Sequence, residues 1–271
     1  ALSQNSGKKK LGNTNTVQHL TSSIMHEDCV KKQFSIVFYV VLDSNYSVGL
    51  ATPAALNMML DTINDRFKKI CVSFTSCTTV LIPNYNYGIA WEYNIHEPAV
   101  TASYYTDKTI NMYLVDSVII LPPPTYTAEG GGYAYMPTAA NLAHPKRDLI
   151  VLEKSLMLNN SSEYVFHCLG HFFGLPNTHD EINPNIPAVP GPLPPVLSQE
   201  FVDGSNCALH GDGFCDTEAD PGTNVPLDGM GNRYMPPKGN YMSHQTGRCR
   251  YTLQQYNHMA NVMLTTRFYL H

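Results

Sequence analysis

The chain has 271 residues, of which 43% are hydrophobic and 14% charged, with a net charge of −5 when histidine is neutral. A chain of this size and composition can bury a substantial core, which excludes a disordered protein. The acidic balance argues against nucleic acid as a partner, and no apolar run reaches the ~18–20 residues that a membrane span requires. Seven cysteines outside any redox motif favour an oxidising location, either secreted and extracellular or, in a bacterium, the periplasm or cell surface.

The first half of the chain alternates between strand and helix patterns. Residues 1–28 are polar, and we interpret them as a flexible arm or the remnant of a pro-segment. Residues 33–43 are β-branched and aromatic and predict a strand. Thr52 and Pro53 predict the cap and first position of a helix that extends to about residue 70. Further strands are predicted over residues 78–83, 109–120 and 148–153, and residues 130–137 predict a loop that leads into a short edge strand.

The second half begins with a helix that starts near Ser161 and Ser162 and stops at Gly174, the residue type that most easily ends a helix. The alternation up to this point predicts an α/β layer with a twisted sheet. Residues 181–200 contain six prolines and predict a long surface loop, and residues 204–237 are rich in Gly and Asp. Residues 252–267 predict a final amphipathic helix.

His167 and His171 are four residues apart on the predicted helix. This spacing puts both imidazoles on one face, where they could grip one metal ion. An isolated pair of this kind is more often structural. Gly174, however, ends the helix where the chain could turn back beneath a metal and present a third ligand. The residue ten positions after His167 is Asn177, and the next histidine is His179.

The stretch FHCLGHFFGLPNTHD (residues 166–180) resembles the HExxHxxGxxH zinc-binding segment of metzincin metallopeptidases. Later motifs resemble the pappalysin family of metzincins in particular. They are HGDGFCDTEADP (residues 210–221), a Met-turn-like Asn240-Tyr-Met, and the segment from Cys249 through YTLQQ, with weaker likeness in GYAYMP and DLIVLE. The resemblance covers residues 30–270.

The resemblance implies an α/β (α+β) metzincin-like catalytic domain. A twisted mixed sheet with long helices would lie above a smaller irregular C-terminal subdomain. The expected boundaries are 1–28 for the arm, 29–175 for an N-terminal subdomain ending in the zinc helix, and 176–271 for a C-terminal subdomain with the Met-turn and final helix.

Carried over by position, the resemblance implies zinc ligation by His167 and His171. Asn177 occupies the third-ligand position, and His179 would replace it only if the loop shifted by two residues. Cys168 stands where the family has its glutamate general base, and a thiol cannot mimic that carboxylate. Losing a general base typically costs about 10²–10⁴-fold in rate.

Two further positions follow from the resemblance. His244, two residues after the Met-turn Met242, occupies the position of a tyrosine that stabilises the developing oxyanion. Asp212, the carbonyl of Cys215 and Thr217 match the spacing of a calcium site, with a solvated acidic turn as an equal alternative.

The cysteine count is odd, so at least one thiol is expected to stay unpaired within a monomer. Cys168 is the best candidate for that thiol. The other six cysteines allow 15 pairings. Pairing among Cys207, Cys215 and Cys249 is favoured because they flank the Met-turn region.

The resemblance implies a zinc metalloendopeptidase scaffold whose peptide lies extended along the edge strand near residues 132–137. The departures at Cys168, Asn177 and His244 predict that hydrolysis is severely impaired or lost. The alternative is a pseudopeptidase that binds a protein or peptide in a vestigial cleft. A cysteine hydrolase built on Cys168 is disfavoured because no oxyanion site is evident.

Overall fold

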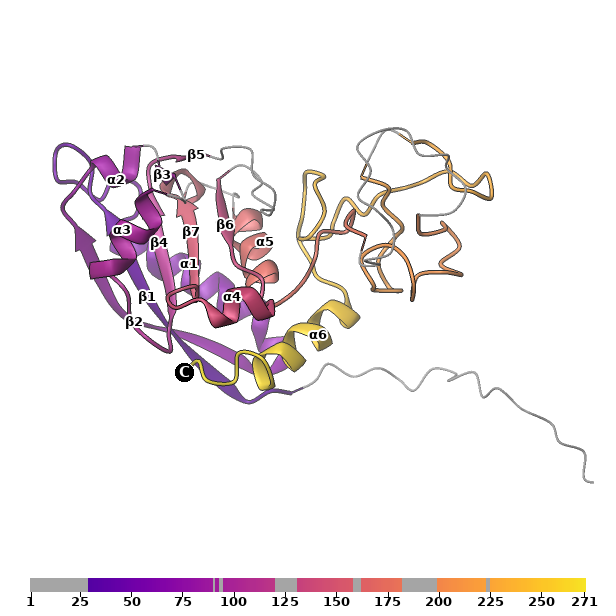
Figure 1. The fold of residues 1–271 in the computed structure, drawn as a ribbon, viewed down its shortest axis with the longest axis horizontal. Helices are drawn as coiled ribbons and strands as arrows, with labels where there is room; N and C mark the ends of the chain where they lie inside the picture. The colour runs from indigo at the N-terminus through magenta and orange to yellow at the C-terminus, as the bar shows by residue number, and fades with distance from the viewer. Residues whose placement is uncertain are drawn as a thin grey trace, which may run out of the picture.

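The computed structural model describes residues 29–89, 91–92, 95–119, 131–157, 162–181, 199–222 and 225–271. The predicted polar arm at residues 1–28 and most of the proline-rich loop lie outside this part of the chain. The centre of the molecule is a five-stranded sheet in the order β2-β1-β4-β7-β6 (Figure 1). Four strands run parallel, and the edge strand β6 runs antiparallel to β7. The strands are β1 (Lys32–Val41), β2 (Val72–Ile82), β4 (Ile110–Val115), β6 (Gly132–Ala134) and β7 (Leu149–Glu153).

Helices cover both faces of the sheet because its inner strands are apolar on both sides. Every residue of β4 is buried. One face packs against α1 (Pro53–Phe67), α5 (Ser162–Phe172) and α6 (Leu253–Leu264). The other face packs against α3 (His96–Ser103) and the small parallel pair β3 (Trp91–Glu92) and β5 (Val118–Ile119), with α2 (Asn86–Ile89) beside them. The α/β prediction is confirmed.

The first predicted helix is confirmed together with its start. Thr52 accepts a hydrogen bond from the amide of Ala55, and Pro53 occupies the first turn. Its apolar stripe is buried against the sheet. A short 3₁₀ helix, Lys68–Ile70, follows, and a disulfide from Cys29 to Cys71 ties the start of β1 to the start of β2.

Two strand predictions need correction. β2 begins at Val72 rather than residue 78, since most of the serines and threonines that obscure it lie on the exposed side of an edge strand. The single strand predicted over residues 109–120 is wrong. The chain leaves the main sheet after Val115, because the amides of Asp116 and Ser117 both donate to the carbonyl of Gly88. The next residues form β5 in the separate small sheet.

Both C-terminal helices begin where predicted, and α5 ends just before Gly174, but α6 ends at Leu264, three residues before the predicted end at residue 267. Gly174 follows α5 with φ +90°, a backbone conformation that glycine tolerates best. Thr252 caps α6 in a capping box with Gln255. Beyond α6, the buried Arg267 donates to the carbonyls of Phe172 and Tyr135 at 2.7 and 2.9 Å.

The same guanidinium pairs with Asp148, and these bonds join the end of the chain to the end of α5 and to the sheet. Two short helices complete the elements, α4 (Ala139–Ala143) and the 3₁₀ helix Lys154–Met157. No helix among the described residues is long and apolar enough to cross a bilayer.

The segment between α5 and α6 is irregular and forms a separate lobe beside the helices (Figure 1). A disulfide joins Cys207 to Cys215, as predicted. The predicted involvement of Cys249 is wrong, because this residue keeps an exposed thiol. Cys168 also keeps its thiol, as expected, and so does Cys77.

A buried carboxyl group supports the edge strand from the side opposite α5. Glu97 on α3 accepts hydrogen bonds from the hydroxyls of Tyr133 at 2.7 Å and Tyr135 at 2.9 Å. Trp91 in turn donates to the Tyr133 hydroxyl. Burial raises the pKa of Glu97 above its ordinary 4.5, and the two tyrosine hydrogen bonds act in the opposite direction.

We expect Glu97→Gln to make the stability of the protein less dependent on pH. The raised pKa means that the folded state holds the Glu97 proton more tightly than the unfolded state does. The stabilisation that protonated Glu97 gives to the folded state is therefore complete below about pH 4.5 and is lost as pH rises through the folded-state pKa. Free energies of unfolding measured in denaturant over a pH series should fall less steeply for Glu97→Gln than for wild type. The exposed control Asp61→Asn should follow wild type, and parallel curves for Glu97→Gln and wild type would contradict this expectation.

Candidate metal centre

The two histidines of α5 are buried and face each other. The Nδ1 atom of His167 lies 2.8 Å from the carbonyl of Tyr241, and that of His171 lies 2.8 Å from the carbonyl of Leu175. A carbonyl only accepts hydrogen bonds, so these contacts favour a proton on each Nδ1 and a lone pair on each Nε2. For His171 the carbonyl is the Nδ1 partner, whereas the His167 Nδ1 also lies 3.3 Å from the Arg248 guanidinium, which only donates. The two Nε2 atoms are 2.9 Å apart.

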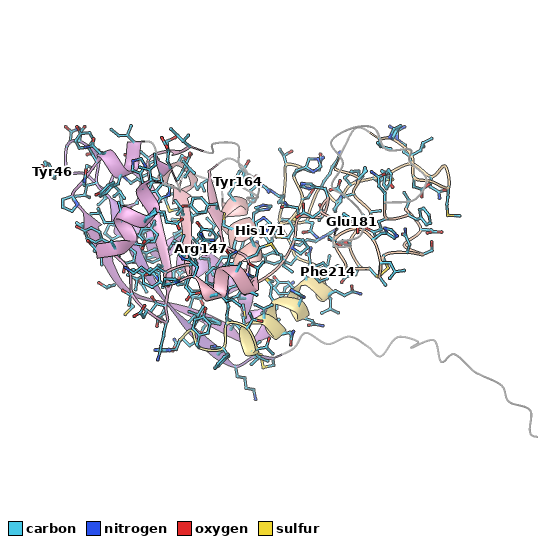
Figure 2. All side chains as sticks on the ribbon, in the orientation of Figure 1. Tyr46, Arg147, Tyr164, His171, Glu181 and Phe214 are labelled. Atoms are coloured by element: carbon cyan, nitrogen blue, oxygen red, sulfur yellow. A yellow bond between two sulfur atoms is a disulfide. The ribbon has the colours of Figure 1, made fainter. Side chains whose placement is uncertain are left out.

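This contact is unfavourable for two neutral rings that are both protonated on Nδ1, because neither Nε2 then has a proton to share. Burial lowers the pKa of both His167 and His171, and each ring is therefore held in its neutral form. A cation bound between the two Nε2 atoms would resolve the conflict. Figure 2 places His171 where the sheet-bearing half of the molecule meets the irregular lobe.

A third donor stands beside this pair. The side chain of Asn177 contacts the His171 imidazole, and its Oδ1 is buried without a hydrogen-bond partner among the described residues. Asn177 is held by its own amide, which donates to Asp180. Two imidazole nitrogens and an oxygen suit zinc, although an amide oxygen binds it more weakly than a third imidazole would. His179 lies instead against the ring of His244, with centroids 5.1 Å apart.

The Met-turn lies directly beneath the pair. The fully buried Met242 approaches α5 so closely that a Cβ atom on Gly170 would be 2.3 Å from its Sδ. Only glycine fits that position. The sequence analysis missed Gly170, although a glycine inside a helix is a signal of close approach by another segment. The Met242 carbonyl also accepts from the amide of Thr178, which joins the Met-turn to the turn after α5.

A buried arginine holds the Met-turn loop against the start of α5. The amide of Arg248 donates to the Glu163 carboxylate at 2.8 Å. Its guanidinium donates to the carbonyl of Ser243 and lies over the ring of Tyr164. The loop that orients His167 through the Tyr241 carbonyl is therefore fixed at both ends.

The two remaining positions of the expected site, Cys168 and His244, differ in their surroundings. Cys168 is 3% exposed and belongs to the main hydrophobic core. His244 is 39% exposed, with its Nδ1 3.8 Å from the Asp220 carboxylate. Neither side chain provides a carboxylate base at the histidine pair.

The residues expected to bind calcium surround a buried carboxylate. Asp212 accepts through Oδ1 from the Phe214 amide and the Thr217 hydroxyl. Its Oδ2 is buried and has no hydrogen-bond partner in the described part of the chain. Glu200, which the sequence analysis missed, packs so close that a Cβ on Gly211 would be 2.3 Å from its Oε2. The backbone amide of Cys215 donates to the side chain of Gln254 at 2.8 Å.

The pKa values of Asp212 and Glu200 are both raised. Burial, together with nearby acidic groups, raises the pKa of Asp212 to about 7. Burial and the charge of Asp212 raise the pKa of Glu200 to about 8. The acidic side chains therefore repel one another, which a bound divalent cation would relieve.

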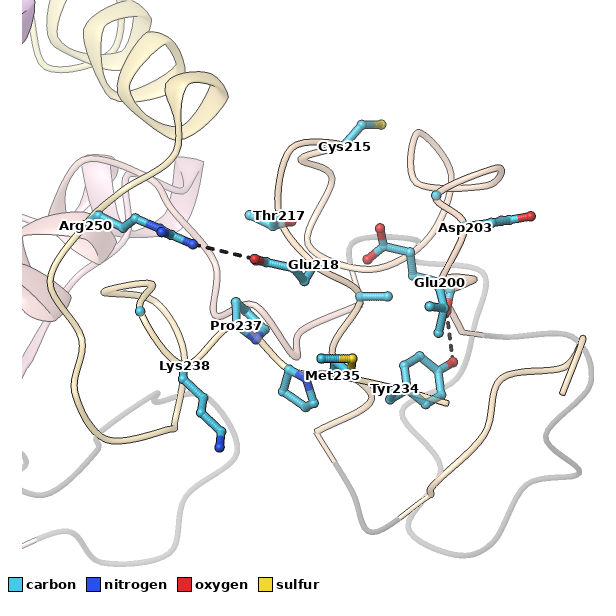
Figure 3. Close-up of a pocket in the computed structure, with 15 residues that line it drawn as sticks. Glu200, Asp203, Cys215, Thr217, Glu218, Tyr234, Met235, Pro237, Lys238 and Arg250 are labelled. Atoms are coloured by element: carbon cyan, nitrogen blue, oxygen red, sulfur yellow. Dashed lines mark hydrogen bonds and ion pairs between the residues drawn. The ribbon is translucent and has the colours of Figure 1, made fainter. Parts of the chain in front are cut away.

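A cavity of about 900 Å³ opens beside these carboxyl groups (Figure 3). Glu200 and Thr217 line it, together with Tyr234, Met235 and the ion-paired Glu218 and Arg250. His167, His171 and Asn177 do not line it. The cavity is thus a feature of the irregular lobe rather than the space above the histidines.

No family model and no curated protein matches the sequence. Solved structures do match its fold. Mature mirolysin from Tannerella forsythia, in complex with a cleaved peptide, has a TM-score of 0.57 at 14% identity, covering 88% of this chain and 94% of that chain. Mirolysin in complex with a compound has a TM-score of 0.53 at 13% identity, covering 88% and 95%. The chain therefore has the α/β fold of a metzincin metallopeptidase catalytic domain.

Proposed function

We propose that this protein is a zinc-binding, peptidase-like protein that holds an extended peptide beside β6 and hydrolyses it very slowly or not at all. The observation that carries the proposal is the 2.9 Å distance between the Nε2 atoms of His167 and His171, with the buried Asn177 Oδ1 beside them. His167, His171 and Asn177 would hold the ion. Zinc bound there would supply Lewis acidity and lower the pKa of a water molecule that it binds.

The peptide would add to the sheet at β6. This strand is at the edge of the sheet, so among the described residues one side of its backbone is not paired with another strand. Helix α5 packs against β6, which would bring a peptide on that edge past the histidines (Figure 1). The cleaved peptide in the mirolysin structure supports a peptide as the ligand class.

Three residues account for the low hydrolytic rate. Cys168 offers a thiol within the apolar core where a carboxylate is needed to accept a proton. Asn177 is the weaker third donor. His244 points its Nδ1 toward Asp220 and contacts His179. Loss of the general base alone reduces the rate by about 10²–10⁴-fold.

A second candidate is a pseudopeptidase that binds a peptide or protein without cleaving it. This candidate is supported by a contrast between two sets of residues: those that shape the site are retained, and those that would carry out hydrolysis are replaced. Gly170 and Gly174 still fit their tight positions, and Met242 still lies beneath the histidines. The three replacements, at Cys168, Asn177 and His244, all fall on positions that would bind the metal or take part in hydrolysis.

We further propose that the protein is extracellular and binds calcium through Asp212, Thr217 and the Cys215 carbonyl. The two disulfides favour an oxidising compartment. The unpartnered Asp212 Oδ2 and the adjacent Glu200 favour a hard cation with oxygen ligands.

The test measures zinc and peptide cleavage on the same preparations. Zinc is determined by elemental analysis after dialysis, and cleavage of a peptide library is followed with and without a zinc chelator, with calcium kept in the buffer. We expect wild type and the exposed control His144→Asn to hold a zinc ion that His171→Asn loses. Any slow cleavage should be chelator-sensitive. If His171→Asn holds as many zinc ions per chain as wild type, the proposal is overturned. Retained zinc and peptide binding without any cleavage would select the pseudopeptidase.

A further inference from the structure

A second group of metal-binding side chains lies on the loops next to the histidine pair. His179 follows α5, Asp220 precedes the turn at Gly222, and His244 follows the Met-turn. One potential ligand atom from each lies within 4.8 Å of those of the other two. We propose that these three side chains form a separate site for a divalent transition-metal ion of the zinc class.

The backbone around the group is arranged to bring these side chains together. Gly222 has φ +62°, and a Cβ atom there would be 2.8 Å from the Cβ of His179. Any other residue at 222 would push His179 away. The close approach therefore restricts position 222 to glycine, a restriction that a solvated loop would not impose.

The carboxylate is oriented before any ion arrives. The Asp220 side chain is fully buried. Its Oδ1 accepts from the amide of Gly222, and its Oδ2 accepts from the hydroxyl of Thr178 at 2.8 Å. Hydrogen bonds of this kind fix the orientation of a carboxylate that ligates a metal.

The histidines retain donor capacity. The Nδ1 of His179 is buried and, in the described part of the chain, has no hydrogen-bond partner. The Nδ1 of His244 faces Asp220. The Gln245 side-chain nitrogen lies 2.7 Å from the opposite ring nitrogen, Nε2. Turning this exposed amide over would put its oxygen there to accept the Nε2 proton and would leave the Nδ1 lone pair for a metal.

Two imidazoles and one carboxylate are a common donor set for zinc, and three protein ligands leave a position for water. That position would be accessible because the His244 side chain is 39% exposed. The three ligands differ from those of the ion proposed above, although His179 is near enough to lower the pKa of His167 and His171 through its charge. Asn177 contacts His171, whereas His179, two residues later, contacts His244. An ion held here would cross-link the turn after α5, the segment before Gly222 and the Met-turn loop.

The test is zinc binding by metal-free protein, followed by equilibrium dialysis and elemental analysis. Cobalt absorption in the visible range gives a second readout of each site. We expect His179→Gln and His244→Gln each to lose one of the bound ions, with its affinity reduced at least about 100-fold. The control His144→Gln should bind as wild type does. Near-ultraviolet circular dichroism of the metal-free variants checks that each is folded.

The variant His171→Asn separates this site from the one proposed above. His171→Asn should lose the ion at the histidine pair and keep the ion at the three-residue site. The double variant with His179→Gln should lose both ions. If His179→Gln and His244→Gln each lose an ion while His171→Asn binds zinc as wild type does, the three-residue site stands and the proposed function fails. If His179→Gln and His244→Gln bind zinc with wild-type stoichiometry and affinity while folded, the three-residue site is overturned.

Discussion

Replacing Cys168 by glutamate and Asn177 by histidine together should raise the rate of peptide hydrolysis by about 10²–10⁴-fold. The glutamate supplies the missing base, and the histidine supplies a stronger third donor beside the Nε2 pair. Position 168 is almost fully buried. Burial there would favour the neutral form of the introduced carboxyl group and bring its pKa closer to neutral, which suits a general base.

The matched control is Cys168→Gln with Asn177→His, which has the same size and the same ligands but no base. Initial rates on a quenched peptide library, with zinc content measured on each sample, give the comparison. We expect the glutamate and glutamine variants to bind zinc equally and to differ only in rate. Equal rates, with both proteins folded and zinc-loaded, would mean that residue 168 does not reach the position of the family's base.

Calcium should stabilise the protein strongly, and Asp212→Asn should abolish the effect. A ligand that binds only the folded state at 100 times its dissociation constant contributes about 2.7 kcal/mol. For a chain of this size that corresponds to a rise in Tm of roughly 5–10 °C. The buried Oδ2 of Asp212 gains a partner, and the repulsion between Asp212 and Glu200 is relieved.

Thermal unfolding in calcium and in chelator gives the two Tm values for each variant. The exposed Asp203→Asn, near the same cavity, should keep the full calcium effect. Without calcium, Asp212→Asn should be at least as stable as wild type, because it removes a buried carboxylate from an acidic cluster. A calcium response in Asp212→Asn equal to that of wild type would rule out this residue as a ligand.

The sequence predicts best where local physics decides the structure. The Thr52 cap, the Gly174 stop and the Thr252 start are short-range signals, and all three are confirmed. The two-histidine face also follows directly from helical spacing, and the structure brings His167 and His171 together as expected.

Other features depend on contacts between distant segments. The break after Val115 is made by the Gly88 carbonyl, which no pattern near residue 116 indicates. Glu200 joins Asp212 only because the irregular lobe folds back at Gly211. His179 looked like a substitute third ligand along the chain, but the turn at residues 177–180 directs it to His244.

The single guanidinium of Arg267 donates both to the last turn of α5 and to Tyr135, immediately after the edge strand. Arg267 therefore helps to hold the histidine helix against the proposed peptide-binding edge. A helix and an edge strand held together in this way need not rearrange around a ligand, so little of the binding free energy is spent on reorganisation. Peptides should then be selected by their fit to a rigid edge, and cutting the chain just before Arg267 should broaden the range of peptides that bind.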